Sequence, residues 1–501
     1  MSWHTALGAA EIFFFVYFAA LNLAYLALNL VAARVIRRET EASASWDAKD
    51  LSTLVPPVSL LVPAYNEEST IAESVRSMLQ LEYPSFEILV VNDGSSDDTL
   101  HVLRREFDLV PFPEAYRISL QTARIRAVYR SLRHPNLRVV DKENGGKSDA
   151  LNAALNAARF PLFCAVDADS VLQRDSLYRV VRPFLEDPST IACGGTVRIA
   201  NGCKVSEGFL TEVGMPRGWL ARVQIVEYLR AFLFGRLGWS PLNAMLIVSG
   251  AFGLFRRSVV IDAGGYSTRT VGEDMELVVR LHRLHRLARR PYRIVFVPDP
   301  ICWTEAPEAL GLLRSQRMRW QRGLLEGLAA NRRLLLHPRG GAPGWLAFPF
   351  FVAFEALGPA IEVAGYLTMG VGAALGVVSW AVLAPFLCLA IGMGMLLSAS
   401  ALLLEEISFH LYKRPRDLAA LLGGIVIENV GFRQLTAVWR LAATLEWLLR
   451  RRRAWGEMRR TGSWNVPAAP ATPAGGAEPA AEHDGKGRRV ITCLDDRNIQ
   501  F

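Results

Sequence analysis

The chain has 501 residues, a length that suits two or three domains rather than one. Hydrophobic residues make up 51% of it, and the net charge of +8 comes from arginines that gather beside apolar runs, which favours a membrane protein over a nucleic-acid-binding protein. The six cysteines show no paired spacing, which argues against a zinc site and against a disulfide framework.

The first predicted element is a membrane-spanning helix in residues 9–33, because about twenty consecutive apolar residues cross a bilayer. Three arginines follow it directly, namely Arg34, Arg37 and Arg38. By the positive-inside rule, these arginines place the residues after them in the cytoplasm. We therefore expect a transmembrane helix in residues 1–38 and a linker in residues 39–57.

Short apolar runs alternate with helical segments from residue 58 onwards, which predicts a doubly wound, mostly parallel α/β sheet. The predicted strands are Val58–Val62, Phe86–Val91, Leu137–Val140, Phe163–Val166, Gly194–Ile199 and Ile294–Val297. In such sheets, ligands bind at the carboxyl ends of the strands. Asn66, Asp93 and Asp167 each come just after a predicted strand, so we expect them along one edge of the sheet.

Two aspartates, Asp167 and Asp169, follow the buried strand Phe163–Val166 with one alanine between them. Such a pair can be a solvated turn or a helix cap. The apolar strand directly before it favours a bound cation instead. Carboxylates suit Mg²⁺ or Mn²⁺, which keep positions open for phosphate oxygens. The sequence therefore predicts a metal–diphosphate site here.

Three other polar positions have both a structural and a functional interpretation. Asp93 can form an Asx-turn or bind a nucleotide. Lys147 can be a solvated surface lysine or, after Gly145 and Gly146 at a helix start, can contact a diphosphate. Asp274 can simply complement the dipole of the helix that it opens, or it can act as a catalytic base.

Residues 219–255 are apolar but carry several charges, so we expect helices at the membrane surface or in the domain core rather than a span. Further on, Gln316 and Trp320 lie four residues apart on a basic helix and can be a packing pair. Trp320 can also stack on a sugar, and Arg319 can pair with a phosphate.

Two further membrane spans are predicted at residues 345–367 and 371–404, the second tilted or kinked at Pro385. Residues 418–449 are apolar but contain several charged residues. A single span there would put the arginines at 450–453 outside, against the positive-inside rule. We therefore expect a hairpin or interfacial helices.

The predicted organisation has three further parts after the linker. A catalytic domain with interfacial helices occupies residues 58–340, and transmembrane and interfacial helices occupy residues 341–460. Residues 461–501 are rich in Pro, Ala and Gly and then charged, which predicts a disordered tail.

Six motifs between Val58 and Gly323 together resemble the membrane-embedded, inverting glycosyltransferases of family 2. This group includes cellulose, hyaluronan, chitin and poly-N-acetylglucosamine synthases. In chain order the motifs are PAYNEE, VVNDGSSDDT, GGKSDALN, DADS, GED and QRMRW. The resemblance implies a GT-A fold, a nucleotide-sugar donor that is usually a UDP sugar, and a Mg²⁺ or Mn²⁺ cofactor.

The resemblance also implies roles for the residues in these motifs. Nucleotide-sugar contacts fall on Ala64, Tyr65, Glu67, Asp93, Lys147 and Asp167. The metal falls on Asp169 with Asp167, and the catalytic base is Asp274. Nucleotide and acceptor contacts fall on Ser249, Gly250, Ala251, Gln316, Arg319 and Trp320.

The predicted function is processive transfer of glucose or N-acetylglucosamine from a UDP sugar to a growing polysaccharide, with inversion. We expect a multi-pass protein of the inner membrane with its catalytic domain in the cytoplasm. The expected partners are the donor, a polysaccharide or lipid acceptor, the bilayer and further secretion subunits, but no nucleic acid. Two alternatives stay open: a non-processive transferase that glycosylates a lipid, and a catalytically silent membrane receptor or secretion component.

Overall fold

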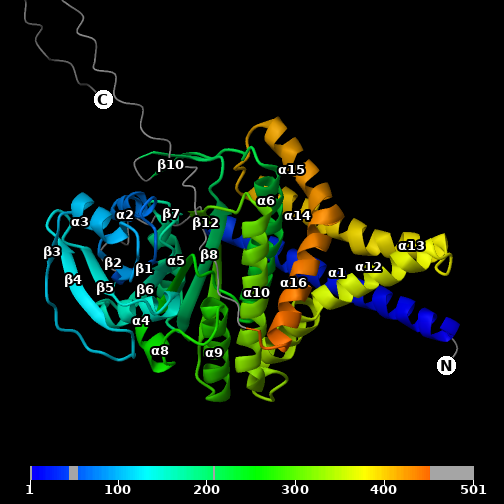
Figure 1. The fold of residues 1–501 in the computed structure, drawn as a ribbon, viewed down its shortest axis with the longest axis horizontal. Coiled ribbons are helices and arrows are strands. Elements are labelled where there is room, and N and C mark those ends of the chain that lie inside the picture. Colours follow the sequence, from blue (N-terminus) through cyan, green and yellow to red (C-terminus); the bar gives the residue numbers. More distant parts are fainter. Residues whose placement is uncertain (1–2, 44–54, 207–208, 452–501) are drawn as a thin grey trace, which may run out of the picture. The chain divides into compact units, whose positions relative to one another are not determined.

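The computed structural model describes residues 3–43, 55–206 and 209–451 of the chain. Most of the predicted linker, the arginines at positions 452 and 453, and the predicted tail lie outside these residues. Within them, a mixed sheet carries helices on both faces, and long apolar helices from both ends of the chain pack together (Figure 1).

The main sheet has ten strands among the described residues. In spatial order they are β3 (Leu109–Pro111), β4 (Ile125–Ser131), β5 (Leu137–Lys142), β2 (Phe86–Asp93), β1 (Val58–Ala64), β6 (Leu162–Val166), β11 (Phe252–Arg256), β8 (Thr190–Ile199), β12 (Arg293–Thr304) and β7 (Val171–Leu172). β5, β2, β1 and β6 run parallel, as do β8 and β12, whereas β11 runs antiparallel between β6 and β8. This arrangement confirms the predicted mostly parallel α/β sheet.

Helices cover both faces of the sheet, so successive side chains of its central strands pack against different helices. The helices beside the sheet are α2 (Ile71–Leu79), α3 (Thr99–Glu106), α4 (Lys147–Ala157), α5 (Ser176–Glu186), α8 (Arg257–Asp262) and α9 (Glu273–Leu287). Leu61 and Leu89 are buried in the cluster that contains α4. Their neighbours Leu60 and Ile88 are buried in the cluster that contains α2 and α5. Burial on both faces explains why these strands are continuous apolar runs in the sequence.

The carboxyl ends of the parallel strands meet at one edge of the sheet. Ala64, at the end of β1, is in register with Asn92 in β2. Asp93, at the end of β2, is in register with Lys142 at the end of β5. The loops that leave these strands therefore lie next to one another.

Residues 219–255 form helices, as predicted, and then a strand that the sequence analysis missed. The elements are α6 (Trp219–Tyr228), the π-helical turn η2 (Leu229–Phe234), α7 (Gly235–Trp239), the 3₁₀ turn η3 (Ser240–Leu242) and β11. β11 continues an apolar stretch, where periodicity cannot separate a buried strand from a buried helix. Its insertion beside β6 places Ala251 next to Asp167, whose N–H donates to the Ala251 carbonyl oxygen at 3.4 Å.

Three helices among the described residues are long and apolar enough to cross a membrane, or four if a bent pair counts as one span. The three are Leu7–Arg38, Trp380–Ser408 and Pro415–Leu448, and the bent pair is Pro343–Ala356 with Gly358–Ala374. Their helical pieces are α1 (Trp3–Ser43), η5 (Pro343–Ala347), α11 (Phe348–Phe350), η6 (Phe351–Ala356), α12 (Gly358–Ala374), α13 (Trp380–Leu387), η7 (Cys388–Gly392), α14 (Met393–Ser408), α15 (Pro415–Ile427), η8 (Glu428–Phe432) and α16 (Arg433–Leu448). α1 thus continues past the boundary predicted at residue 38.

Two predicted spans have different limits in the structure. The span predicted at residues 345–367 lies inside the bent pair, in which the second helix is bent by 44° from the direction of the first. The prediction of one span at 371–404 is wrong at its start, because residues 371–374 complete α12. A turn then follows, in which Gly376 has a φ of +69°. Pro385 lies inside α13, and a π-helical turn comes directly after that helix.

The last predicted segment, residues 418–449, does not form a hairpin. α15 and α16 continue one another through η8, where Val430 and Gly431 leave the helical conformation. By length and apolarity this segment counts as a candidate span. In Figure 1, however, α16 lies along α10 (Leu310–Ala330) and across α12. The hairpin prediction is therefore wrong, and the interfacial placement stays a prediction.

Candidate active site

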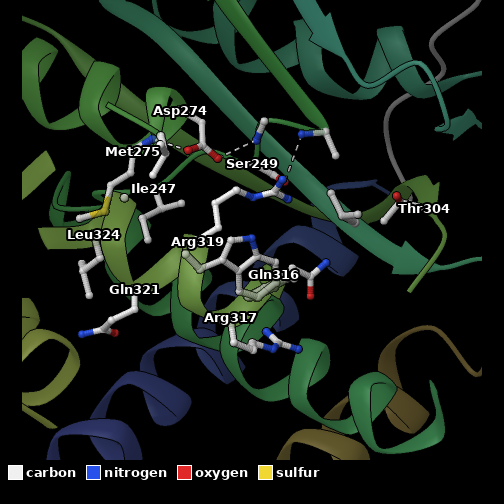
Figure 2. A pocket seen from close by; sticks show the side chains of 18 of the residues that line it. Ile247, Ser249, Asp274, Met275, Thr304, Gln316, Arg317, Arg319, Gln321 and Leu324 are labelled. Atoms are coloured by element: carbon white, nitrogen blue, oxygen red, sulfur yellow. Dashed lines mark hydrogen bonds between the residues drawn. The ribbon is translucent and has the colours of Figure 1, made fainter. Parts of the chain in front are cut away.

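A cavity of about 1580 Å³ opens at the carboxyl edge of the sheet and continues between α7, α10 and the apolar helices α1, α12 and α16. All of the predicted site residues except Asp169 line it. Figure 2 shows Asp274 and Ser249 on one side of this space, with Arg319 extending from α10 toward them. The structure therefore gathers residues from six separate motifs around one space.

The loop after β1 lines the open end of the cavity. Ala64 is buried, whereas the ring of Tyr65 is 45% exposed and free to contact a ligand. Hydrogen bonds hold Glu67 in place: its N–H donates to Thr99 Oγ1 and its Oε2 accepts from Thr70 Oγ1, both at 2.8 Å. The loop is thus tied to the helices that follow β1 and β2.

Asp93, at the end of β2, holds the glycine loop that leads into α4. Its carboxylate accepts hydrogen bonds from the N–H groups of Gly145 at 3.0 Å and Gly146 at 2.7 Å. The buried ammonium of Lys142 pairs with the same carboxylate. This side chain therefore positions the loop that carries Lys147, a role that the Asx-turn and nucleotide interpretations of Asp93 did not include.

Lys147 lines the cavity beside two carboxylates. Its Nζ lies 2.6 Å from Asp167 Oδ1 and 3.3 Å from Glu273 Oε1. Burial lowers the pKa of this ammonium, but the neighbouring carboxylates outweigh that effect and raise the pKa above its usual range. A pair whose lysine is 37% exposed contributes at most ~1 kcal/mol to stability. Lys147 therefore stays charged at neutral pH and can exchange these partners for a bound anion.

Asp169 is the predicted site residue that does not line the cavity. Its side chain is buried, and Thr304 Oγ1 donates to its Oδ2 at 3.4 Å. No cluster of three or more His, Cys, Asp or Glu side chains suited to a metal occurs among the described residues. Asp167 and Asp169 supply oxygen donors only. Such a pair fits Mg²⁺ or Mn²⁺ in its chemistry, because these ions fill their remaining positions with water and phosphate oxygens.

Asp274 lies in the first turn of α9, with both carboxylate oxygens oriented by backbone N–H groups. Gly250 donates to Oδ2 at 3.0 Å and Met275 donates to Oδ1 at 2.8 Å (Figure 2). A Cβ on Gly250 would lie 3.1 Å from Lys147 Nζ and 3.3 Å from Asp274 Oδ2. The missing side chain at Gly250 therefore lets the loop pass between this cation and this carboxylate.

Two glycines bring α10 against the start of α9. A Cβ built on Gly272 or on Gly323 would lie 2.8 Å from the Cα of the other residue, a distance that side chains do not tolerate. Asp274 comes two residues after the first glycine, and Trp320 comes three residues before the second. The close approach thus fixes the separation of these two side chains, which belong to different helices.

Trp320 and Phe232 form an aromatic wall of the cavity, with ring centroids 5.5 Å apart. The guanidinium carbon of Arg317 lies 4.3 Å from the centroid of the Trp320 ring, and Glu227 pairs with this arginine at 2.6 Å. Gln316 is buried, and in the described part of the chain its Oε1 accepts no hydrogen bond. Trp320 and Gln316 therefore offer a ring surface and a hydrogen-bond acceptor, beyond the packing pair considered from the sequence.

Glu273 and Arg236 are charged residues of the cavity that were not among the predicted site residues. Glu273 directly precedes Asp274; burial raises the pKa of its carboxyl, while the nearby Lys147 acts in the opposite direction. Arg236 faces the cavity from α7. Arg236 could have been identified from the sequence because it is a charged residue inside the apolar run of residues 219–255. A buried charge is costly, so its presence there suggests a function.

The other end of the cavity is lined by ion pairs that join the apolar helices. They are Arg433 with Glu362 at 2.7 Å, Arg440 with Glu355 at 3.0 Å, and Arg230 with Glu428 at 2.9 Å. Charged groups within apolar helices are costly unless they are paired, and they commonly mark a polar pathway. The cavity is therefore polar beyond the catalytic domain as well as inside it.

Two family models match the chain. "Glycosyl transferase family 2" matches residues 59–262, and "Glycosyl transferase family group 2" matches residues 162–402. Together they cover residues 59–402, which include almost all of the sheet, every predicted site residue and α10 through most of α14.

Characterised relatives are poly-β-1,6-N-acetyl-D-glucosamine synthases from staphylococci. The chain is 30% identical to that of Staphylococcus aureus (strain COL) over 269 residues, which is 53% of this chain and 54% of the relative. It is 29% identical to that of Staphylococcus epidermidis over 270 residues, 54% of this chain and 55% of the relative. The chain thus matches about half the length of these relatives.

Solved structures with a similar arrangement include a mannosyltransferase from Pyrobaculum calidifontis in complex with GDP-Man and Mn²⁺. It has a TM-score of 0.49 and 20% identity, and the match covers 87% of this chain and 100% of that one. Another is glucosyl-3-phosphoglycerate synthase from Mycobacterium tuberculosis, with a TM-score of 0.35 and 18% identity over 57% of this chain and 85% of that one.

Proposed function

The chain belongs to glycosyltransferase family 2 and its sheet is of the GT-A class, and we propose from this that it transfers N-acetylglucosamine or glucose from a UDP sugar to a growing polysaccharide. The relatives named above make poly-N-acetylglucosamine synthesis the more specific proposal. The transfer is processive and inverts the anomeric centre, so that an α-linked donor gives a β-linkage.

One observation carries this proposal: a single cavity runs from the nucleotide-side loops, past Asp274 and Trp320, to the apolar helices. A transferase that adds one sugar to a soluble acceptor needs no polar space between candidate membrane helices. A polymerase needs room for the donor, the acceptor end and the sugars already added. The continuity of the space therefore supports a polysaccharide acceptor.

In the proposed reaction, an acceptor hydroxyl attacks the anomeric carbon of the donor. A new C–O bond forms, and the bond between that carbon and the diphosphate oxygen breaks, with UDP leaving with the electron pair. Asp274 takes the hydroxyl proton, for which its carboxylate is oriented by Gly250. Lys147 offsets charge on the departing diphosphate. In-line attack places the acceptor on the opposite side of the sugar from the diphosphate.

The proposed cofactor is Mg²⁺ or Mn²⁺, held by Asp167 and Asp169. When bound, such an ion supplies positive charge that neutralises the diphosphate. Asp169→Asn is expected to raise by at least ~10-fold the Mn²⁺ concentration needed for half-maximal UDP release, because changing even a group that only supports a metal ligand costs about 10–100-fold in affinity. Titration of Mn²⁺ into the EDTA-treated variant measures this, and an unchanged midpoint would contradict the role of Asp169.

The proposal places the protein in the inner membrane, with residues 58–340 as the cytoplasmic catalytic domain and residues 341–460 as membrane and interfacial helices. Arg34, Arg37 and Arg38 are exposed near the end of α1 that leads to the sheet, which supports this orientation. Labelling of single cysteines on either side of the membrane tests it.

The test of function uses the full chain in lipid nanodiscs with a panel of nucleotide sugars. UDP release with UDP-N-acetylglucosamine or UDP-glucose and a radiolabelled product that forms a high-molecular-weight ladder would support the proposal. A product of one added sugar in the lipid fraction would favour the lipid-glycosylating alternative. No nucleotide release with any donor would favour the catalytically silent alternative.

A further inference from the structure

Most arginines of the cavity are neutralised by a carboxylate. Arg317 pairs with Glu227, and Arg230, Arg433 and Arg440 pair with carboxylates as described above. Such pairing is expected, because an uncompensated charge is costly once it leaves water. An arginine in this cavity that departs from the pattern therefore needs an explanation.

Arg236 departs from it. Its Nη1 is buried and, among the described residues, donates no hydrogen bond. The guanidinium carbon lies 4.5 Å from the centroid of the Phe232 ring, so the charged group stacks on an aromatic face. Among the described residues, no carboxylate forms an ion pair with it. Burial lowers the pKa of this guanidinium to about 10, with Asp274 acting in the opposite direction, so the group stays charged at neutral pH.

The position of Arg236 is on the acceptor side of the cavity. Phe232, on which it stacks, is in contact with Trp320, and Arg236 and Asp274 line the same cavity. Its helix α7 packs against α1, where a Cβ on Gly238 would lie 2.9 Å from Leu28 Cβ. Arg236 thus lines the cavity together with Asp274 and Trp320, on a helix that packs against a candidate membrane helix, and an acceptor chain in this cavity would meet it.

We propose that Arg236 selects the acceptor by charge, binding an oxygen of a neutral acceptor sugar and excluding sugars that carry an ammonium group. A guanidinium donor suits the carbonyl oxygen of an acetamido group or a hydroxyl oxygen, whereas it repels a protonated amine. The inference rests on the proposed function. It implies that the enzyme extends N-acetylated chains and rejects chains whose amino groups have been deacetylated.

The experiment measures transfer from UDP-N-acetylglucosamine to short β-linked N-acetylglucosamine oligosaccharides and to their fully deacetylated counterparts, at a pH where the amines are protonated. The wild-type full chain in nanodiscs is expected to show kcat/KM at least ~100-fold lower for the deacetylated acceptor, the scale of like-charge repulsion in a binding site. Arg236→Gln is expected to reduce this preference to less than ~10-fold, chiefly by improving use of the cationic acceptor.

Two variants control the result. Arg236→Lys keeps the charge and should keep the exclusion of the deacetylated acceptor. Arg104→Gln, on α3 away from the cavity, should behave as wild type. Binding of the UDP sugar to each variant shows that it is folded.

The possible failures are separate. If Arg236→Gln transfers sugar and keeps the wild-type preference, or if the wild type uses both acceptors equally, the role of Arg236 is refuted while the proposed function stands. If the wild type transfers no sugar from any nucleotide donor to either acceptor, the proposed function is refuted, and this inference with it.

Discussion

Replacing Asp274 with asparagine is expected to lower turnover by at least ~100-fold, the usual contribution of a general base, while donor binding changes little. The carboxamide has the size of the carboxylate, and its oxygen can still accept the hydrogen bond that Gly250 or Met275 now donates. What it cannot do is take the proton of the acceptor hydroxyl. The loss should therefore appear in kcat rather than in the affinity for the UDP sugar.

Measurement of UDP release and of UDP-sugar binding separates these two effects. Glu273→Gln is the matched control, since it removes the neighbouring carboxylate of the same helix turn. That variant removes one of the two acidic partners of Lys147, so we expect a smaller change in kcat. If Asp274→Asn retains turnover within a few-fold of wild type, Asp274 is not the base. The helix-dipole interpretation would then be sufficient.

The central sheet could be predicted from the sequence because its strands are buried on both faces and bounded by polar loops. The run Phe163–Val166 is an example: it is apolar throughout and ends at Asp167. The topology of such sheets then brings Asp93 and Asp167 to one edge without any knowledge of distances. For this reason the meeting of these strand ends could be predicted from the sequence, while the metal–diphosphate site at Asp167 and Asp169 stays a prediction.

Features that depend on contacts between distant parts of the chain could not be predicted in this way. β11 is apolar like the helices before it, so only its partners β6 and β8 reveal it as a strand. The hydrogen bonds that the Asp93 carboxylate accepts from Gly145 and Gly146 join residues more than fifty positions apart. In the sequence, Arg236 is one of several charged residues on an apolar segment. Only the structure shows that its Nη1 is buried and donates no hydrogen bond to the described residues.

The close contact between Gly272 and Gly323 also depends on distant parts of the chain, and it predicts a large effect of adding a side chain there. Alanine is favoured over glycine inside a helix by about 1 kcal/mol, so Gly323→Ala in α10 would stabilise an isolated helix. In the protein its Cβ would lie 2.8 Å from Gly272 Cα and 2.9 Å from Gly272 N, and backbone atoms cannot rotate away. The two helices must separate, at a cost of roughly 1–3 kcal/mol for overpacking.

Such a separation should be far more harmful to catalysis than to folding, because Trp320 and Asp274 lie on opposite sides of the contact. A shift of about 1 Å in a catalytic arrangement can cost ~100-fold in rate, so we expect a fall in kcat/KM of this order for Gly323→Ala. Gly327→Ala is the matched control: it is one turn further along α10, and its Cβ would meet Glu276 at an ordinary 3.7 Å. That variant should keep the wild-type rate and lose no thermal stability. Equal activity of the two variants in the UDP-release assay would show that the spacing of α9 and α10 does not control the reaction.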